Sequence, residues 1–420
     1  MGEPAAQRHP RRLHRLRAGE GTGRPDLIGR PYEEYPVAVP PDVSTQLHLG
    51  VALDGAGWHP SSWRQSDARP EDLLTAAYWT DLTVTAERGL LDFVTIEDGL
   101  ALQSDHPWRA DARTDRVRGR LDAVQIAARV APRTRHIGLI PTAITTHTEP
   151  FHLSKAIATL DFVSSGRAGV RVQVSSNPES TGHFGRPVAD DPMAEAADYV
   201  EVLRRLWDSW EDDAEIRDAA TGRFVDRDRL HYIDFEGRWF SVKGPSITPR
   251  PPQGQPLVAA LGHGDPAYRL IAAGADLGFI TPRSAHDIAT ITDTIAALRP
   301  AGAPRVQIIV DLVVFLGDTA ASAAAHRAQL DTLLGREYIS DAEVFVGTPA
   351  GLADLLTHWQ TAGADGFRLR PATVPHDLAQ ITDGLVPELQ RRGVFRTEYQ
   401  QSTLRGLFGL SRPANRYVNS

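Results

Sequence analysis

Eight short and largely apolar runs recur along the chain, and most of them are rich in Val, Ile and Leu. They span residues 47–53, 91–96, 136–144, 168–176, 256–261, 275–280, 306–316 and 365–371. Such runs are typical of strands buried on both faces of a parallel sheet. Between them, apolar residues three and four apart predict helices over residues 72–88, 154–165, 193–210, 286–298 and 349–362.

Eight strands that alternate with helices predict an α/β fold, a (β/α)8 TIM barrel with right-handed crossovers. A doubly wound open sheet would also alternate, but it normally carries a glycine fingerprint after its first strand. Gly55 and Gly57 follow that strand without the third glycine or the helix that the fingerprint requires. The barrel is therefore the favoured fold.

The regions outside this alternation define the domain organisation. Residues 1–45 are rich in Arg, Pro and Gly, and we expect a disordered arm there. The barrel spans 46–383 and carries an insertion between its fourth and fifth strands at 211–255, whose alternating apolar residues predict a short hairpin. Residues 384–420 form a C-terminal extension that we expect to pack on the barrel or on a partner.

Composition excludes several classes of function. The 420 residues include 45 basic and 53 acidic side chains, a net charge of −8, which argues against nucleic acid as a partner. No run of eighteen apolar residues is present, so no membrane partner is expected. The chain has no cysteine, which excludes disulfides and thiolate metal sites. We expect a cytoplasmic protein.

Candidate site residues follow from the barrel, because TIM-barrel sites lie in the loops after the strands. After the first four predicted strands come His59, Asp98, the group Thr142, Thr146 and His147, and Asn177. His59 and His147 are candidate general acids or bases, although a lone histidine is also common as a structural residue. Histidines and carboxylates converge in no recognisable ligand pattern, so the sequence predicts no metal site.

The fifth predicted strand is followed by Gly262, His263 and Gly264, and a helix begins at Asp265. A glycine-flanked turn that opens a helix presents free backbone N–H groups and suits a phosphate. An ordinary tight turn would have the same sequence, and that alternative stays open.

Several segments together resemble a known family. They are GAGWHPSSWR (55–64), TIEDGLALQ (95–103), the run 134–178, VEVLRRLWDSWEDDA (200–214), FEGRWFSVKGPSITPRPPQGQP (235–256), FVGTPAGLADLL (345–356), VPELQRRGVFRTEY (386–399) and TLRGLFGL (403–410). The chain resembles the bacterial luciferase-like flavin monooxygenases, in the branch of nitrilotriacetate and dibenzothiophene-sulfone monooxygenases. The resemblance runs in colinear order over about residues 46–417.

This resemblance implies a two-component enzyme. Such barrels take reduced FMN (FMNH2) from a separate NAD(P)H:flavin reductase and use O2 as co-substrate to oxygenate a small organic molecule, with secondary metabolism among the expected settings. Asp98 and Thr142 match the family's residues beside the isoalloxazine. Thr146 and the turn at 262–264 join them as cofactor-binding candidates, and His59, His147 and Asn177 are candidates for contacts with the substrate or the flavin peroxide.

The sequence departs from the family where the flavin phosphate binds. Ala189 and Met193 stand where the family has a His and a Tyr that approach the phosphate, and neither can donate a hydrogen bond from its side chain. His263 or Arg186 could compensate. The alternatives are a flavin-depleted, non-catalytic barrel that partners an active homologue, or an enzyme that uses the pocket without FMN. By resemblance we expect a homodimer or homotetramer, or a heterodimer with a paralogue.

Overall fold

A computed structural model describes residues 46–104, 106, 109, 111–175, 177–185 and 187–418. The predicted arm at 1–45 and Arg186 lie outside the described residues. The eight predicted strands are present as β1 (His48–Leu53), β2 (Phe93–Ile96), β3 (Gly138–Ile144), β4 (Gly169–Gln173), β9 (Leu257–Gly262), β10 (Leu277–Ile280), β11 (Gln307–Leu316) and β13 (Gly366–Pro371).

These strands pair in parallel in the order β1-β2-β3-β4-β9-β10-β11-β13, and β13 pairs back with β1. The sheet is therefore a closed barrel, and the predicted (β/α)8 fold is confirmed. A further strand, β12 (Glu343–Gly347), was not predicted; it pairs with the C-terminal half of β11 outside the ring. Its four partly exposed residues gave it no buried apolar run.

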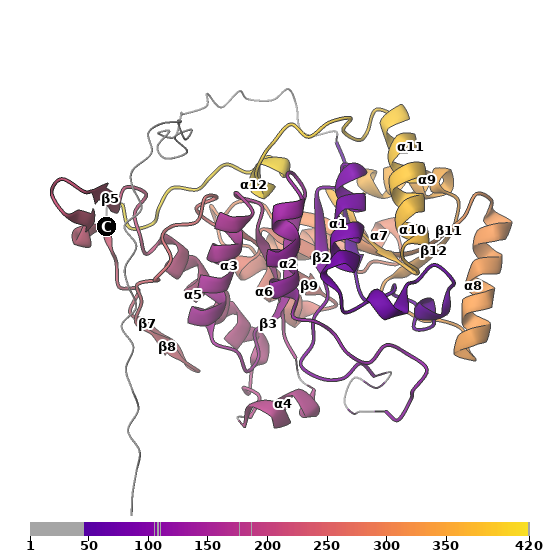
Figure 1. Cartoon of the computed structure of the whole chain (residues 1–420), viewed down its shortest axis with the longest axis horizontal. Coiled ribbons are helices and arrows are strands. Elements are labelled where there is room, and N and C mark those ends of the chain that lie inside the picture. The colour runs from indigo at the N-terminus through magenta and orange to yellow at the C-terminus, as the bar shows by residue number, and fades with distance from the viewer. Residues whose placement is uncertain are drawn as a thin grey trace, which may run out of the picture. The chain divides into compact units, whose positions relative to one another are not determined.

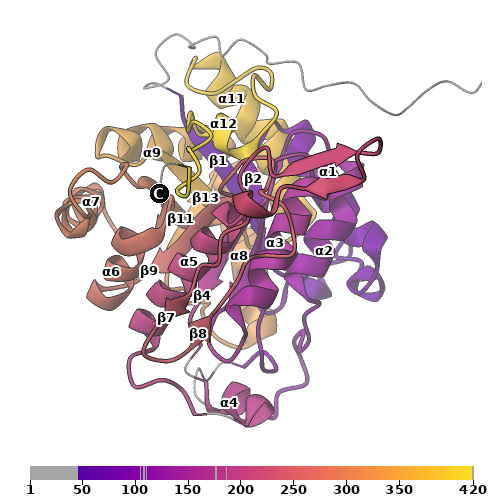
Figure 2. The same cartoon turned by 90° about the vertical axis from the view of Figure 1, so that its left-hand side faces the viewer.

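Helices follow the strands and surround the barrel (Figures 1 and 2). They are α1 (Ala76–Arg88), α2 (Ala123–Val130), α3 (Pro150–Val163), α4 (Pro178–Phe184), α5 (Pro192–Asp208), α6 (Asp265–Gly274), α7 (Ala285–Leu298), α8 (Ala320–Leu334), α9 (Pro349–Thr361), α10 (His376–Ala379), α11 (Val386–Arg391) and α12 (Leu404–Leu407). All five predicted helices are present. Helix α8 was not predicted, because its alanine-rich sequence carries little contrast between its faces.

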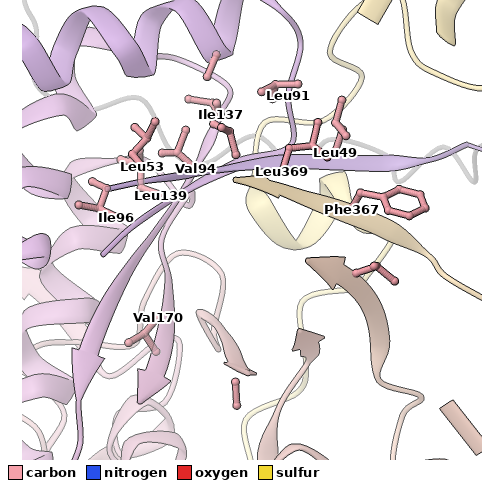
Figure 3. Close-up of a cluster of buried hydrophobic side chains, with 14 of the residues drawn as sticks. Leu49, Leu53, Leu91, Val94, Ile96, Ile137, Leu139, Val170, Phe367 and Leu369 are labelled. Carbon is pink, nitrogen blue, oxygen red and sulfur yellow. The ribbon is translucent and has the colours of Figure 1, made fainter. Parts of the chain in front are cut away.

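Alternating side chains divide the interior into two regions. Residues such as Val94 and Ile96 of β2 point outward into the apolar layer between strands and helices, which Figure 3 shows along β1, β2, β3 and β13. Residues between them point into the barrel. Near the N-terminal ends of the strands this lumen is filled by an apolar cluster that includes Phe93 and Phe279. Leu404 and Phe408 of the C-terminal extension belong to the same cluster.

The insertion carries two hairpins. The predicted one is confirmed as β7 (Phe235–Glu236) paired with β8 (Ser241–Val242). The other, β5 (Glu215–Asp218) with β6 (Arg223–Val225), was not predicted, because its residues are mostly polar. No described helix combines the length and apolarity needed to cross a lipid bilayer.

Candidate active site

A pocket of about 560 Å³ lies over the C-terminal ends of β1 to β4. Its walls come from the loop after β1 (54–62), the segment after β2 (98–104 and 116–120), the end of β3 and the residues from the end of β4 to the start of α4. In Figure 1 the segment after β2 and α4 lie at the lower end of the barrel, whereas α12 lies toward the upper end. The pocket therefore occupies the end of the barrel where TIM-barrel sites are found.

His59 lines this pocket but is fully buried, and protein atoms engage both of its ring nitrogens. Its Nδ1 accepts a hydrogen bond from the Ser61 N–H at 3.1 Å, which leaves Nε2 to donate to Asp331 Oδ1 at 3.2 Å. Burial lowers the pKa of His59 to about 4. The imidazole is therefore neutral at pH 7 and ties the loop after β1 to α8.

Asp98 lines the pocket and organises the segment after β2. Its Oδ1 accepts a hydrogen bond from the Gly99 N–H at 2.7 Å, and its Oδ2 accepts one from the Ala123 N–H at the start of α2 at 2.9 Å. Burial raises the pKa of this carboxyl. Asn177 also lines the pocket and caps α4, because its Oδ1 accepts from the Glu179 N–H at 2.9 Å.

Three other predicted residues do not line the pocket. Thr142 is fully buried inside the barrel, and its hydroxyl accepts from Arg171 Nε at 3.0 Å. The Thr146 hydroxyl accepts from the Ser175 N–H at 2.9 Å and so connects the loops after β3 and β4. His147 has a φ of 71° and stacks on Phe184 with ring centroids 5.3 Å apart. These residues support the pocket wall from behind.

The predicted phosphate turn also lies away from this pocket. Gly262, His263 and Gly264 end β9 and begin α6, and none of them lines the cavity. His263 is half exposed, and its ring lies 2.9 Å from the Thr281 hydroxyl and 3.5 Å from an Asp341 carboxylate oxygen. The structure thus brings together His59, Asp98 and Asn177 but not the glycine turn. Ala189 and Met193 do not line the cavity either.

A layer of buried charged side chains lies inside the barrel toward the pocket end, and most of these residues were not predicted. Glu97 forms ion pairs with Arg171 on β4 and with Arg368 on β13. Asp311 on β11 forms ion pairs with Arg368 and with Arg370, which is also on β13. Burial alone would raise the pKa values of Glu97 and Asp311, but the arginines outweigh it and hold both below their usual range. The signal was available: arginine at alternate positions of a buried strand, as in GFRLRP, must face a polar interior.

This layer meets the pocket through two side chains. Gln173 lines the pocket, and its Oε1 accepts from Arg171 Nη2 at 2.9 Å, which leaves its amide NH2 group to donate to a ligand. Trp58 also lines the pocket, and the Arg370 guanidinium carbon lies 4.4 Å from its ring centroid. The charged layer therefore orients polar and aromatic groups of the pocket floor.

A second cavity of about 330 Å³ adjoins the first. Its lining is mainly apolar and includes Trp63, Leu73 and Trp79. Arg116 and Arg120 line both cavities. Arg120 pairs with Asp54 through Nη2 and Oδ2 at 2.6 Å. The site can therefore hold a flat polar group over the barrel and receive an apolar group beside it, with cationic side chains between them.

The model of the family described as "Luciferase-like monooxygenase" matches residues 58–343. The chain belongs to the luciferase-like monooxygenase family. It is 33% identical over 442 residues to N-acetyl-S-(2-succino)cysteine monooxygenase of Bacillus subtilis (strain 168), over 89% of this chain and 98% of that protein. It is 30% identical over 442 residues to nitrilotriacetate monooxygenase component A of Aminobacter aminovorans, over 88% of this chain and 98% of that protein. The predicted family and branch are thus confirmed.

Solved structures of luciferase-like proteins share the fold. The structure of a riboflavin lyase with modified FMN and riboflavin superposes with a TM-score of 0.78 at 23% identity, over 88% of this chain and 97% of that one. At this identity the likeness concerns the fold alone.

Proposed function

We propose that this protein is the oxygenase component of a two-component monooxygenase, which receives reduced FMN from a separate NAD(P)H:flavin reductase and oxygenates a small organic acid. The observation that carries the proposal is the pocket over β1 to β4, in a chain of the luciferase-like monooxygenase family. A homodimer or homotetramer and a cytoplasmic location stay predictions.

The described residues fit a flavin. The cavity of about 560 Å³ falls within the range of about 300–1,000 Å³ that is typical of sites for cofactors and small molecules. The amide NH2 of Gln173 and the peptide groups around Asp98 supply hydrogen-bonding partners for a polar ring edge. The pocket lining contains two acidic residues, Asp54 and Asp98, and their negative charge is offset by the positive charge of Arg116 and Arg120.

Reduced FMN would supply the electrons that activate O2, and the residues of this chain would bind and orient it. Gln173 would donate to the ring system, and Trp58, held against Arg370, would wall the cavity. Asp98 would hold the segment after β2 closed over the site through its bonds to the Gly99 and Ala123 N–H groups. Neutral His59 would position the loop after β1 rather than transfer a proton, since both of its nitrogens are engaged.

The proposed substrate class rests on the arginines and on the relatives. The names of the two relatives specify substrates that carry carboxylate groups. Arg116 and Arg120 line the junction of the polar and apolar cavities. There the carboxylate of an acid could pair with an arginine while its apolar portion contacts the apolar cavity.

A second candidate function is that of a non-catalytic barrel. It is favoured by Ala189 and Met193, whose side chains cannot donate hydrogen bonds to a phosphate.

The experiment is turnover under 18O2 with a flavin reductase, NADH, FMN and a panel of small organic acids, analysed by mass spectrometry. We expect at least one acid to gain a single 18O atom only when this protein is present. Arg116→Ala should raise KM for that acid by about tenfold or more, the loss of one charge-assisted contact, whereas Arg227→Ala, an exposed arginine of the insertion, should not. Bound reduced FMN without any labelled product would refute the substrate class. Absence of flavin binding would refute the enzyme and favour the non-catalytic barrel.

A further inference from the structure

A third cavity, of about 570 Å³, lies on the side of the barrel that α8 and α10 cover, away from the residues assigned to the flavin. Both helices pack against β11 (Figure 1). His326 of α8 and His376 of α10 line this cavity, and their ring centroids lie 5.0 Å apart. Asp377, the residue after His376, is fully buried.

We propose that His326, His376 and Asp377 bind a divalent transition-metal ion such as Zn²⁺. One nitrogen of each imidazole and one oxygen of the carboxylate all lie within 4.8 Å of one another. In a tetrahedral site with bonds of about 2.0–2.2 Å the ligand atoms are separated by roughly 3.5 Å, so modest rotation of the two imidazoles completes the site. Two histidines and one carboxylate, with a fourth position for water, are a common zinc ligand set.

The hydrogen-bonding states of the histidines suit a metal. His376 Nε2 lies 3.1 Å from the Leu316 carbonyl oxygen, so this nitrogen must donate and Nδ1 carries the lone pair. A metal-binding histidine typically has its other nitrogen held in this way by a carbonyl or carboxylate. His326 Nδ1 is buried and has no hydrogen-bond partner among the described residues. A buried polar atom without a partner is costly, and a metal ion would satisfy it.

The charges around the cavity favour a cation. Asp67 and Asp318 line it together with the histidines, and none of its described lining residues is Lys or Arg. Asp377 accepts hydrogen bonds from the Leu316 N–H at 2.8 Å and from the Thr373 N–H at 2.8 Å, and neither donor carries a charge. By contrast, the buried carboxylates inside the barrel are paired with arginines.

The sequence alone could not reveal this site, because 50 residues separate His326 from His376 and no short motif joins them. A bound ion would link α8 to α10. Since α8 also carries Asp331, which accepts the hydrogen bond from His59, the ion would fix a helix that supports the wall of the flavin pocket.

The test is calorimetric titration of the untagged, chelator-treated full-length protein with ZnCl2, together with anomalous diffraction from crystals grown with zinc. We expect one ion per chain with micromolar or tighter affinity, and an anomalous peak between His326 and His376. The double variant His326→Ala/His376→Ala should bind at least about 100-fold more weakly, because two ligands are lost. The matched variant His286→Ala/His358→Ala, which removes two exposed histidines from α7 and α9, should bind like the wild type.

Absence of binding at zinc concentrations of about 100 µM would overturn the proposal. So would equal affinity of the two double variants, or a peak elsewhere in the anomalous map. Should the first double variant fail to fold, the anomalous map of the wild type alone decides. Flavin binding is measured separately on the same protein, so failure of this proposal is distinguishable from failure of the proposed function.

Discussion

Asp311 should be among the most sensitive positions of the barrel, because it neutralises two arginines that are themselves buried. Arg368 Nε lies 2.7 Å from Asp311 Oδ1, and Arg370 Nε lies 2.9 Å from Asp311 Oδ2. All three side chains are at most 1% exposed. Asp311→Asn keeps the shape of the side chain and removes its charge, so the substitution isolates the electrostatic contribution.

The magnitude follows from the charges that remain. Two unit charges about 4 Å apart attract by about 4 kcal/mol at an effective dielectric constant of 20, so two pairs lose about 8 kcal/mol in gross terms. Relief of the desolvation of Asp311 returns several kcal/mol, and breaking a buried pair typically costs about 3–5 kcal/mol in net terms. Arg368 keeps Glu97 at 3.3 Å and Arg370 keeps Asp341 at 2.6 Å, which favours the lower end of that range. We expect a loss of about 3 kcal/mol.

Equilibrium urea denaturation followed by tryptophan fluorescence measures this loss, and far-UV circular dichroism verifies the native fold. The matched control is Asp213→Asn, since Asp213 pairs with Arg229 on the surface and its side chain is 66% exposed. An exposed pair of this kind contributes about 0–1 kcal/mol. A loss for Asp311→Asn as small as that of the control would refute the reasoning that this charge layer is held together by ion pairs.

Three further outcomes are expected. Burial lowers the pKa of His59 from 6.5 to about 4, so between pH 6.5 and pH 4 the unfolded chain binds a proton that the folded chain does not. The free energy of unfolding should therefore decline by about 3 kcal/mol as the pH falls through that window. His59→Gln should flatten this part of the profile of unfolding free energy against pH, and an unchanged slope would contradict the assignment to His59. Ala189→His combined with Met193→Tyr should tighten binding of reduced FMN by about tenfold or more in an anaerobic titration, if these positions face the phosphate as the family resemblance implies. Gly50→Ala should lower the free energy of unfolding by about 1–3 kcal/mol, because the added Cβ would lie 2.4 Å from the Phe93 ring in the lumen. Gly119→Ala, whose added Cβ would have no neighbouring atom within 4 Å, should leave the free energy of unfolding unchanged.

The fold was largely predictable because a buried parallel strand has a strong local signature. Nearly all of the eight barrel strands are apolar runs that stand out against the neighbouring sequence, whatever strands they pair with. β12 and α8 lack that contrast. β12 is only half-buried at the rim, and α8 is a run of alanines whose inner face differs little from its outer face.

The site was predictable only in part, because position along a strand does not specify the surroundings of a side chain. The barrel rule placed Asp98 and Asn177 correctly at the pocket end. It placed Gly262 there too, although the cavity is confined to β1–β4. Arg368 and Arg370 were not predicted as part of the site, although two arginines at alternate positions of a buried strand indicate a polar interior. Their partners Glu97 and Asp311 come from other parts of the barrel, so the ion pairs are defined only once the sheet closes.

The most direct measurement is an anaerobic titration of the purified protein with photoreduced FMN, followed by flavin fluorescence and calorimetry. It compares the wild type with Gln173→Ala, which removes the amide proposed to bind the flavin, and with Gln400→Ala, which changes an exposed glutamine of the C-terminal extension. Micromolar or tighter binding that Gln173→Ala weakens by about tenfold and Gln400→Ala leaves unchanged is the predicted result. Absence of binding at about 100 µM, or equal affinity in all three proteins, would contradict the assignment of this pocket to reduced FMN.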